Sequence, residues 1–255
     1  MKGRVLDRVV AAEREHRSVA LATDLATGWQ LLLEGEHVEG DLVLDDTAIE
    51  KVRETWRTGR NRTVETAAGP VFVEVLTPPH RCFIIGAVHI AQPLAKMLVM
   101  TDYTVTVIDP REAFATEARF PGIEMTSEWP DEALERLKPD RGSAVVALTH
   151  DPKLDDPALA AALRSECFYI GALGSRRNHV GRCARLKELG FSDNDLARIH
   201  GPVGLAIGAI SPAEVAISIV AEMTQILRRG EDVKAAGNLA RFRSPRRTAR
   251  YWHTA

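Results

Sequence analysis

The sequence predicts an α/β protein in which a doubly wound parallel sheet follows a smaller N-terminal α+β domain. From residue 81 onward, short and almost continuously apolar segments alternate with stretches of helical periodicity. Such segments are typical of parallel strands that crossover helices bury on both faces. Before residue 77, short strand and helix patterns occur without this alternation. That difference indicates a separate small domain.

The first domain is predicted to contain two helices and several strands. Apolar side chains of residues 2–16 fall on one helical face. In residues 45–59, acidic side chains begin a helical pattern and Gly59 ends it. The other segments predict strands at 18–25 and 29–35, and strand material at 63–76 around a turn at Gly69–Pro70.

Two adjacent prolines, Pro78 and Pro79, mark the predicted boundary because proline stops both helices and sheet pairing. We therefore expect a small domain at 1–78, a second domain at 79–235 and a basic tail at 236–255. The tail is expected to be solvated, with a docking arm for an acidic partner as the alternative.

The second domain is predicted to be Rossmann-like. Strands are expected at 81–86, 103–109, 143–149 and 167–174, and helices at 151–166 and 211–230. Ser211, Pro212 and Glu214 form a strong helix start, with a cap, a proline at the first helical position and a capping box. Because crossovers between parallel strands are right-handed, the pattern predicts a doubly wound sheet.

The composition describes an ordinary globular protein. Of the 255 residues, 45% are hydrophobic and 27% are charged, and the formal net charge is -2. This balance gives no reason to expect binding to nucleic acid or to a membrane. We find no secretory signal and no transmembrane segment, so we expect a cytoplasmic protein. The spacing of Cys82, Cys167 and Cys183 fits neither a disulfide framework nor a zinc site, and buried thiols are expected.

The candidate binding residues follow the carboxyl ends of the predicted strands, where open α/β sheets bind their ligands. They are Gly86, His89, Asp109, Arg111, His150, Asp151, Gly174, Ser175, Arg176, Arg177, Gly204 and Gly208. Several of these residues have an alternative role that does not involve a ligand. His89 either contacts a ligand or caps a helix or faces solvent. Asp109 either binds a ribose or pairs with Arg111, while residues 150–151 either contact the ligand or only open a loop.

The segment Gly-Ala-Leu-Gly-Ser-Arg-Arg-Asn-His, residues 171–179, is the most informative. Its glycines leave backbone N–H groups accessible, and Ser175 can cap a helix whose N-terminus favours an anion. Arg176 and Arg177 add cationic donors suited to phosphate or another oxyanion. The segment therefore predicts an anion site, and a capped helix with two solvated arginines is the alternative.

The first strand of this domain leads into an altered dinucleotide fingerprint. Gly86 fits the tight turn from strand to helix, but Val88 stands where the second glycine of the fingerprint is expected. A β-branched side chain there obstructs the approach of a pyrophosphate. The sequence also has no catalytic triad signature, no phosphate-binding loop of the Walker A type and no His-Glu-x-x-His. We assign no catalytic residue and no metal ligand.

The segments 71–95, 105–122, 169–191 and 197–223 together resemble the XdhC/CoxI family. The resemblance implies a maturation factor for molybdenum hydroxylases such as xanthine dehydrogenase and carbon monoxide dehydrogenase. It implies binding of the molybdenum–molybdopterin cofactor as cargo, protection during its sulfuration, and delivery to an apo-enzyme. It also implies a homodimer.

The chain departs from the family pattern at three positions. Val88 replaces a glycine, His37 replaces the cysteine of a Gly-Gly-Cys-Val-Glu-Gly motif, and Ala206 replaces an aspartate. A second Cys-Gly-Gly stretch is absent near residues 67–72. These departures argue against a conventional thiolate ligand, and His37 is expected to be a loop histidine that faces solvent rather than an imidazole substitute.

The leading hypothesis is therefore a non-catalytic accessory protein that handles a molybdopterin-type cofactor. Its expected partners are a molybdenum hydroxylase apo-enzyme and a cofactor sulfurase. One alternative is an NAD(P)-dependent oxidoreductase that uses Asp109 for the ribose and His89 or His150 in proton transfer. The other is a degenerate scaffold or regulatory member of the family that has kept only its partner interactions.

Overall fold

A computed structural model describes residues 3–67, 69–111, 113–114 and 116–229. The chain divides into two compact units, residues 1–79 and 80–255, and each is described by itself. The predicted basic tail at 236–255 lies outside the described residues.

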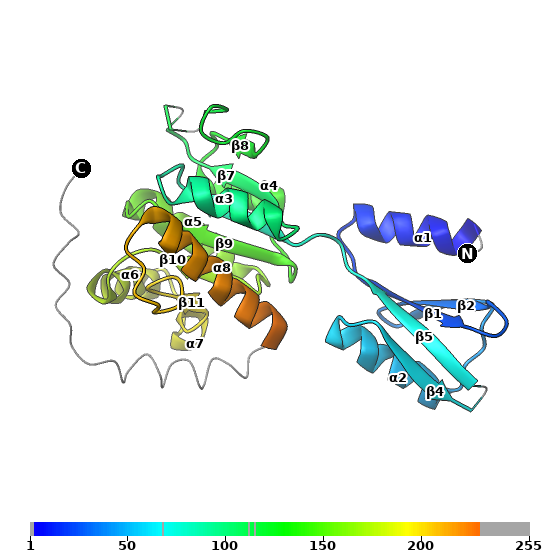
Figure 1. The fold of residues 1–255 in the computed structure, drawn as a ribbon. Helices are drawn as coiled ribbons and strands as arrows, with labels where there is room; N and C mark the ends of the chain where they lie inside the picture. Colours follow the sequence, from blue (N-terminus) through cyan, green and yellow to red (C-terminus); the bar gives the residue numbers. More distant parts are fainter. Residues whose placement is uncertain (1–2, 68, 112, 115, 230–255) are drawn as a thin grey trace. The chain divides into compact units, whose positions relative to one another are not determined.

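The first unit is built on a five-stranded antiparallel sheet with the order β3-β2-β1-β5-β4 (Figure 1). The strands are β1 (Val19–Asp24), β2 (Gln30–Glu34), β3 (His37–Gly40), β4 (Arg62–Thr66) and β5 (Gly69–Leu76). The predicted strand material at 63–76 forms β4 and β5, but the turn predicted at Gly69–Pro70 was wrong, because these two residues begin β5. His37 begins strand β3, so the expectation that it lies in a loop was wrong, although its side chain is exposed.

Helices α1 (Gly3–Arg14) and α2 (Asp46–Thr58) cover opposite faces of this sheet. Because side chains alternate along a strand, Ala20 and Ala22 of β1 pack on the α2 side and Leu21 packs on the α1 side. Helix α2 ends, as predicted, at Gly59, whose φ of 63° is left-handed.

The second unit contains a six-stranded parallel sheet with the order β11-β10-β9-β6-β7-β8. The strands are β6 (Arg81–Ile85), β7 (Thr104–Ile108), β8 (Glu124–Thr126), β9 (Ser143–Ala147), β10 (Tyr169–Ala172) and β11 (Ile199–His200). Numbered from β6, this is the order 3-2-1-4-5-6 of the Rossmann fold. The predicted α/β fold with a doubly wound parallel sheet is confirmed. The short strands β8 and β11 were not predicted.

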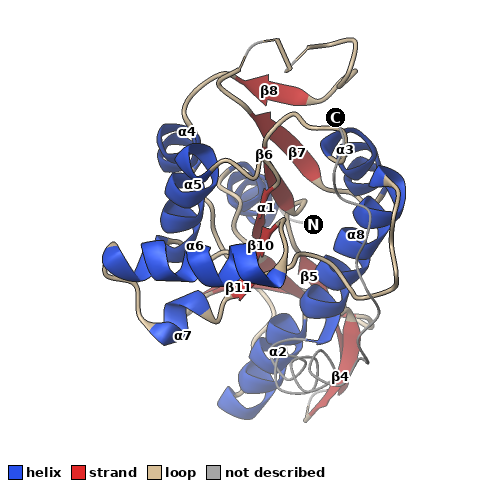
Figure 2. Cartoon of the chain, turned by 90° about the vertical axis from the view of Figure 1, so that its left-hand side faces the viewer, coloured by secondary structure: helices blue, strands red, loops and turns tan. Residues whose placement is uncertain are grey.

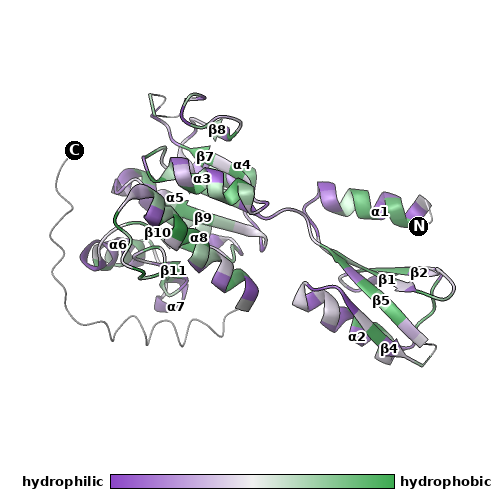
Figure 3. Cartoon of the chain, viewed as in Figure 1, coloured by the Kyte–Doolittle hydropathy of each residue, from purple (hydrophilic) through white to green (hydrophobic). Residues whose placement is uncertain are grey.

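Helices lie on both faces of this sheet (Figures 1 and 2). Helices α3 (Ala91–Met100) and α8 (Pro212–Arg229) pack together on one face, through Leu94, Leu98 and Ile219. On the other face are α4 (Pro130–Leu137) and α5 (Pro152–Arg164), with α6 (Arg176–Glu188) and the short α7 (Asp193–Leu196) beside them. The apolar character of the central strand β9 is visible in Figure 3. Among the described helices, none is long and apolar enough to cross a membrane.

The predicted start of α8 is confirmed. The backbone N–H of Glu214 donates to Oγ of Ser211 at 3.3 Å, and that of Ser211 donates to Oε2 of Glu214 at 2.9 Å. These two bonds are the capping box that the sequence predicts, and they satisfy N–H groups that a helix terminus leaves without intrahelical partners.

The cysteines differ in burial. Cys82 and Cys167 are buried, whereas Cys183 is partly exposed, so the prediction of a buried thiol was wrong for Cys183. Burial raises the pKa of the Cys167 thiol to about 11. A thiol with that pKa is un-ionised at neutral pH and is a poor nucleophile.

Candidate functional site

The point where the chain reverses direction across the second sheet lies between β6 and β9. These neighbouring strands pair in parallel from Arg81 with Ser143 to Ile85 with Ala147. From β6 the chain runs outward to β7 and β8. From β9 it runs outward in the opposite direction, to β10 and β11. Ligands of this fold bind beyond the carboxyl ends of the strands at this point. The loops after β6, β7, β9 and β10 carry most of the predicted residues.

Gly86 forms the tight turn after β6 that the sequence predicts. Its φ is +101°, a conformation that residues with a side chain rarely adopt. A Cβ atom at this position would lie 2.5 Å from Cγ2 of Thr149, which follows β9. The turn therefore requires glycine both for its backbone angle and for its contact with the neighbouring loop.

We expect Gly86→Ala to lower the free energy of unfolding by about 2 kcal/mol, because the strained backbone and the contact with Thr149 both oppose the new methyl group. The matched control is Gly122→Ala, since Gly122 also has a positive φ, +70°, but its Cβ would meet nothing within 4 Å. The control measures the effect of the strained backbone alone, and we expect it to lower the free energy of unfolding by about 1 kcal/mol. Equal losses in urea-unfolding measurements would show that the contact with Thr149 is unimportant.

Asp109, at the end of β7, is fully buried and accepts four hydrogen bonds. The Arg111 side chain donates from Nε to Oδ1 at 2.9 Å and from Nη2 to Oδ2 at 2.8 Å. The backbone N–H groups of Arg111 and Ala87 donate at 3.0 Å and 2.8 Å. Burial alone would raise the pKa of Asp109, but these hydrogen bonds outweigh it and hold the pKa below its ordinary value of 3.8. The structure thus forms the ion pair that was one of the two predicted possibilities.

Hydrogen bonds within the protein occupy groups that a bound dinucleotide would require. A carboxylate offers about four lone-pair sites, and all four donors around Asp109 come from the protein, which leaves little capacity for a ribose hydroxyl. The N–H of Ala87, inside the altered fingerprint, is bonded to Asp109. Val88 packs partly against the core beside α3 and α8. The turn therefore differs from a pyrophosphate-binding turn in its hydrogen bonds as well as in its sequence.

The loop after β9 is organised by Asp155, a buried residue in the first turn of α5. Its carboxylate accepts from Oγ1 of Thr149 at 2.7 Å and from the backbone N–H groups of Thr149 and His150 at 3.2 Å and 3.1 Å. His150 is exposed and has a φ of +62°, which is unusual for a residue with a side chain. Asp151 is the N-cap of α5 and accepts from the N–H of Lys153 at 2.9 Å.

The turn after β10 leads into α6, whose N-cap is the predicted Ser175. Its Oγ accepts from the N–H of Asn178 at 3.2 Å. Arg176 and Arg177 occupy the first two helical positions and are exposed. Gly174 has a φ of +139°, and a Cβ on it would lie 3.8 Å from Nδ1 of His150. The start of α6 and the loop after β9 are therefore adjacent.

The loop that precedes α8 is held by Glu222, a buried residue of that helix. Oε2 of Glu222 accepts from the Tyr169 hydroxyl at 2.7 Å and from the Gly204 N–H at 2.8 Å. His200 stacks on Tyr169 and lies 3.4 Å from Oε1. Gly204 has a φ of +90° and packs on Ser218. Gly208 has a positive φ in open space.

The structure brings some predicted residues together and not others. Asp109 and Arg111 are directly bonded, and His150 lies beside Gly174. His89 is exposed and lies directly before Ile90, the N-cap of α3. Ala206 is exposed in the loop before α8.

Three functional candidates were missed because they lie inside helices: Asp155, Arg182 and Glu222. Arg182 and Leu186 are four residues apart on α6 and are both buried. For Arg182, the sequence signal that could have identified it was therefore a charged residue on the apolar face of a predicted helix.

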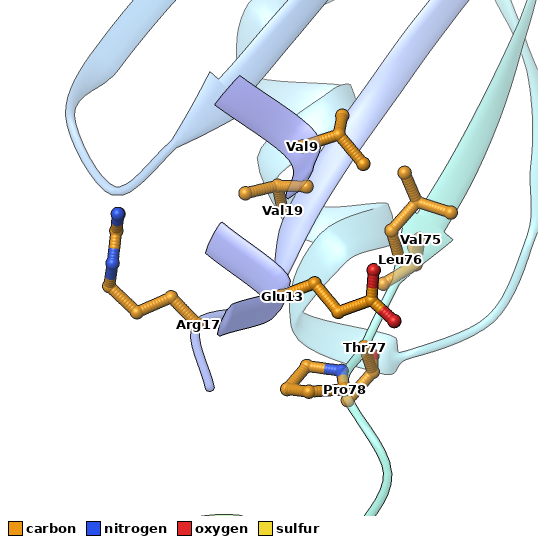
Figure 4. Close-up of a pocket in the computed structure, with 8 residues that line it drawn as sticks. All are labelled: Val9, Glu13, Arg17, Val19, Val75, Leu76, Thr77 and Pro78. Atoms are coloured by element: carbon orange, nitrogen blue, oxygen red, sulfur yellow. The ribbon is translucent and has the colours of Figure 1, made fainter. Parts of the chain in front are cut away.

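A separate pocket lies in the first unit, between α1 and the sheet (Figure 4). Its volume is about 250 Å³, and its walls include Val9, Glu13, Val19, Val75, Leu76 and Pro78. It contains none of the predicted binding residues. Within the described part of the chain, no group of three or more His, Cys, Asp or Glu residues is placed to hold a metal ion.

The fold defines a Rossmann-type α/β protein, and the carboxyl edge of its second sheet carries the N-terminus of α6 with the exposed Arg176 and Arg177. A family model described as the XdhC Rossmann domain matches residues 82–223. The chain belongs to the XdhC family.

Two bacterial proteins are similar in sequence to this chain. It is 31% identical over 176 residues to a probable xanthine dehydrogenase subunit from Bacillus subtilis, covering 66% of this chain and 51% of the relative. It is 39% identical over 94 residues to the molybdenum cofactor insertion chaperone PaoD of Escherichia coli, covering 36% and 30%. The chain thus spans about half or less of these relatives.

A solved structure is also similar. It is described as a xanthine dehydrogenase from Bacillus halodurans, and it superposes with a TM-score of 0.68 and 25% identity. The match covers 90% of this chain and 66% of that chain.

Proposed function

We propose that this chain is an accessory protein that binds the molybdenum cofactor at the carboxyl edge of its second sheet. It protects the cofactor and delivers it to a molybdenum hydroxylase such as xanthine dehydrogenase or carbon monoxide dehydrogenase. The names of the two relatives support a role connected with this cofactor. The observation that carries the proposal is the start of α6, because it suits the phosphate of a molybdopterin ligand.

The start of α6 offers an anion both positive charge and N–H donors. The first N–H groups of a helix have no intrahelical partner, and the helix dipole is positive at this end. Together they favour a phosphate or another anion. Arg176 and Arg177 stand at this end and are exposed. Two buried carboxylates nearby, Asp109 and Asp155, each face an arginine of their own, which reduces their repulsion of an anion.

The double variant Arg176→Ala/Arg177→Ala tests the site. We expect its dissociation constant for isolated molybdenum cofactor to rise about 10- to 100-fold, because two charge-assisted contacts are lost. The matched control is Arg141→Ala/Arg164→Ala. It removes the same charge from the opposite edge of the sheet, where β9 begins and α5 ends. If both double variants bind the cofactor equally well, the site assignment is wrong.

Several finer points belong to the same proposal. The protein acts in the cytoplasm, functions as a homodimer and protects its cargo during sulfuration by a cofactor sulfurase. The first unit contributes to partner recognition. Chemistry on the cofactor itself is left to the hydroxylase, so Arg176 and Arg177 bind and orient the ligand and catalyse no step.

A second candidate function is NAD(P)-dependent oxidoreduction, which the strand order of the second sheet favours. Asp109 and Ala87 are bonded to each other and Val88 stands in the fingerprint, so we rank it below cofactor handling. The scaffold alternative predicts a complex with a hydroxylase and no bound ligand.

A further inference from the structure

Two neighbouring loops of the candidate site are joined beneath the surface by one buried ion pair. Asp155 of α5 and Arg182 of α6 have side chains that are 2% and 5% exposed, with Oδ2 of Asp155 lying 3.5 Å from Nη2 of Arg182. The same Nη2 donates to the carbonyl oxygen of Leu173 at 2.9 Å. Leu173 directly precedes Gly174, where the turn into α6 begins.

Each partner holds a different loop. Asp155 accepts both hydrogen bonds of Thr149 and the N–H of His150, and so fixes the loop after β9. Arg182 fixes the turn after β10 through Leu173. Because the pair links the two loops, it sets the distance between His150 and Gly174 at the start of α6.

The guanidinium of Arg182 is poorly satisfied for a buried cation. Its Nε and Nη1 atoms are buried and have no hydrogen-bond partner among the described residues. Buried donors without partners oppose folding, and a buried ion pair is weak evidence for a stabilising role. A role in folding alone therefore explains this arginine poorly, whereas a role in placing the loops explains both of its contacts.

We propose that Asp155 and Arg182 are the positioning pair of the anion site, which hold the loop after β9 and the turn after β10 in the arrangement that the ligand binds. This inference rests on the function proposed above and names residues that do not touch the ligand. An ordinary ion pair between two helices holds only the helices, whereas this pair controls two loops at once.

The chain offers a control in Asp156 and Arg185, whose side chains are 12% and 43% exposed. These residues also join α5 to α6, with Nε and Nη2 of Arg185 donating to Asp156 at 2.5 Å and 3.1 Å. They are the same residue types on the same helices, but their ion pair joins the two helices without bonding to either loop. Arg185→Met therefore removes an interhelical ion pair and leaves the loops in place.

The experiment compares wild-type protein with Arg182→Met, Arg182→Lys and Arg185→Met. Amide hydrogen exchange is followed in residues 148–151 and 172–175, and binding of isolated molybdenum cofactor is measured by pterin fluorescence. For Arg182→Met we expect exchange in both loops to accelerate about tenfold and the dissociation constant to rise about tenfold. Arg182→Lys keeps a cation that can reach Leu173 and Asp155, so it should stay within about threefold of wild type in both measurements.

The outcomes separate this inference from the proposed function. If Arg182→Met and Arg185→Met change exchange in the two loops equally, the pair has no special control and the inference is overturned. If wild-type protein does not bind the cofactor, the proposed function fails, while the exchange data still decide the positioning role. Should Arg182→Met not fold, Asp155→Asn replaces it. Asparagine loses the acceptor for the His150 N–H, so accelerated exchange in residues 148–151 is then expected, and unchanged exchange overturns the inference.

Discussion

Asp109→Asn is expected to lower the free energy of unfolding by about 3 kcal/mol at pH 7, because an amide nitrogen would face donors of Arg111 or Ala87 inside the protein. The carboxylate currently accepts from all of them. An unsatisfied guanidinium adds to the loss. Urea unfolding monitored by circular dichroism measures the difference.

The loss should depend on pH in a defined direction. The pKa of Asp109 is lower in the folded chain than its ordinary value of 3.8. The carboxylate therefore contributes its full stability above about pH 4 and loses it as the pH falls through the folded pKa. The difference in free energy of unfolding between Asp109→Asn and wild type should shrink below pH 3.8.

Glu166→Gln is the control, because Glu166 forms an exposed pair with Arg141 and its loss should change stability little at any pH. A constant difference across this pH range would contradict the role given to the Asp109 carboxylate.

Glu222→Leu is expected to destabilise the second unit by about 4 kcal/mol, because two buried donors lose their acceptor. These donors are the Tyr169 hydroxyl and the Gly204 N–H. The loop before α8 depends on the second bond, so limited proteolysis near residues 203–208 should also become faster. Thermal and urea unfolding give the energy, and mass spectrometry of the digests locates the cleavage.

The control for this prediction is Glu222→Gln. Its remaining carbonyl oxygen can accept from both Tyr169 and Gly204, so we expect a loss within about 1 kcal/mol of wild type. If leucine and glutamine are tolerated equally, Glu222 does not hold the loop through hydrogen bonds.

The overall architecture of the second unit could be predicted because its strands are nearly continuous apolar runs and its helices have clear starts. Ser175 and Ser211 cap helices as predicted, since capping depends on residues close in sequence. The strands β8 and β11 have only three and two residues, too few for any periodicity. Their pairing comes from tertiary contacts with the longer strands beside them.

The candidate site was predicted less completely. Residues at strand ends, such as Gly86 and Asp109, could be found because the fold places ligands there. Whether Asp109 faced a ligand or Arg111 depended on side-chain geometry, which sequence spacing does not specify. Asp155 and Arg182 are 27 residues apart, and their contact requires α5 and α6 to pack against each other.

We propose that this chain binds the molybdenum cofactor rather than a dinucleotide. The most direct test is to incubate the purified protein with isolated molybdenum cofactor, NAD(H) or NADP(H), and to measure retained molybdenum, pterin and nucleotide after gel filtration. We predict that molybdenum and pterin remain with the protein and that neither dinucleotide does. Retention of a dinucleotide alone would contradict the account and favour an oxidoreductase, whereas retention of no ligand would favour the scaffold alternative.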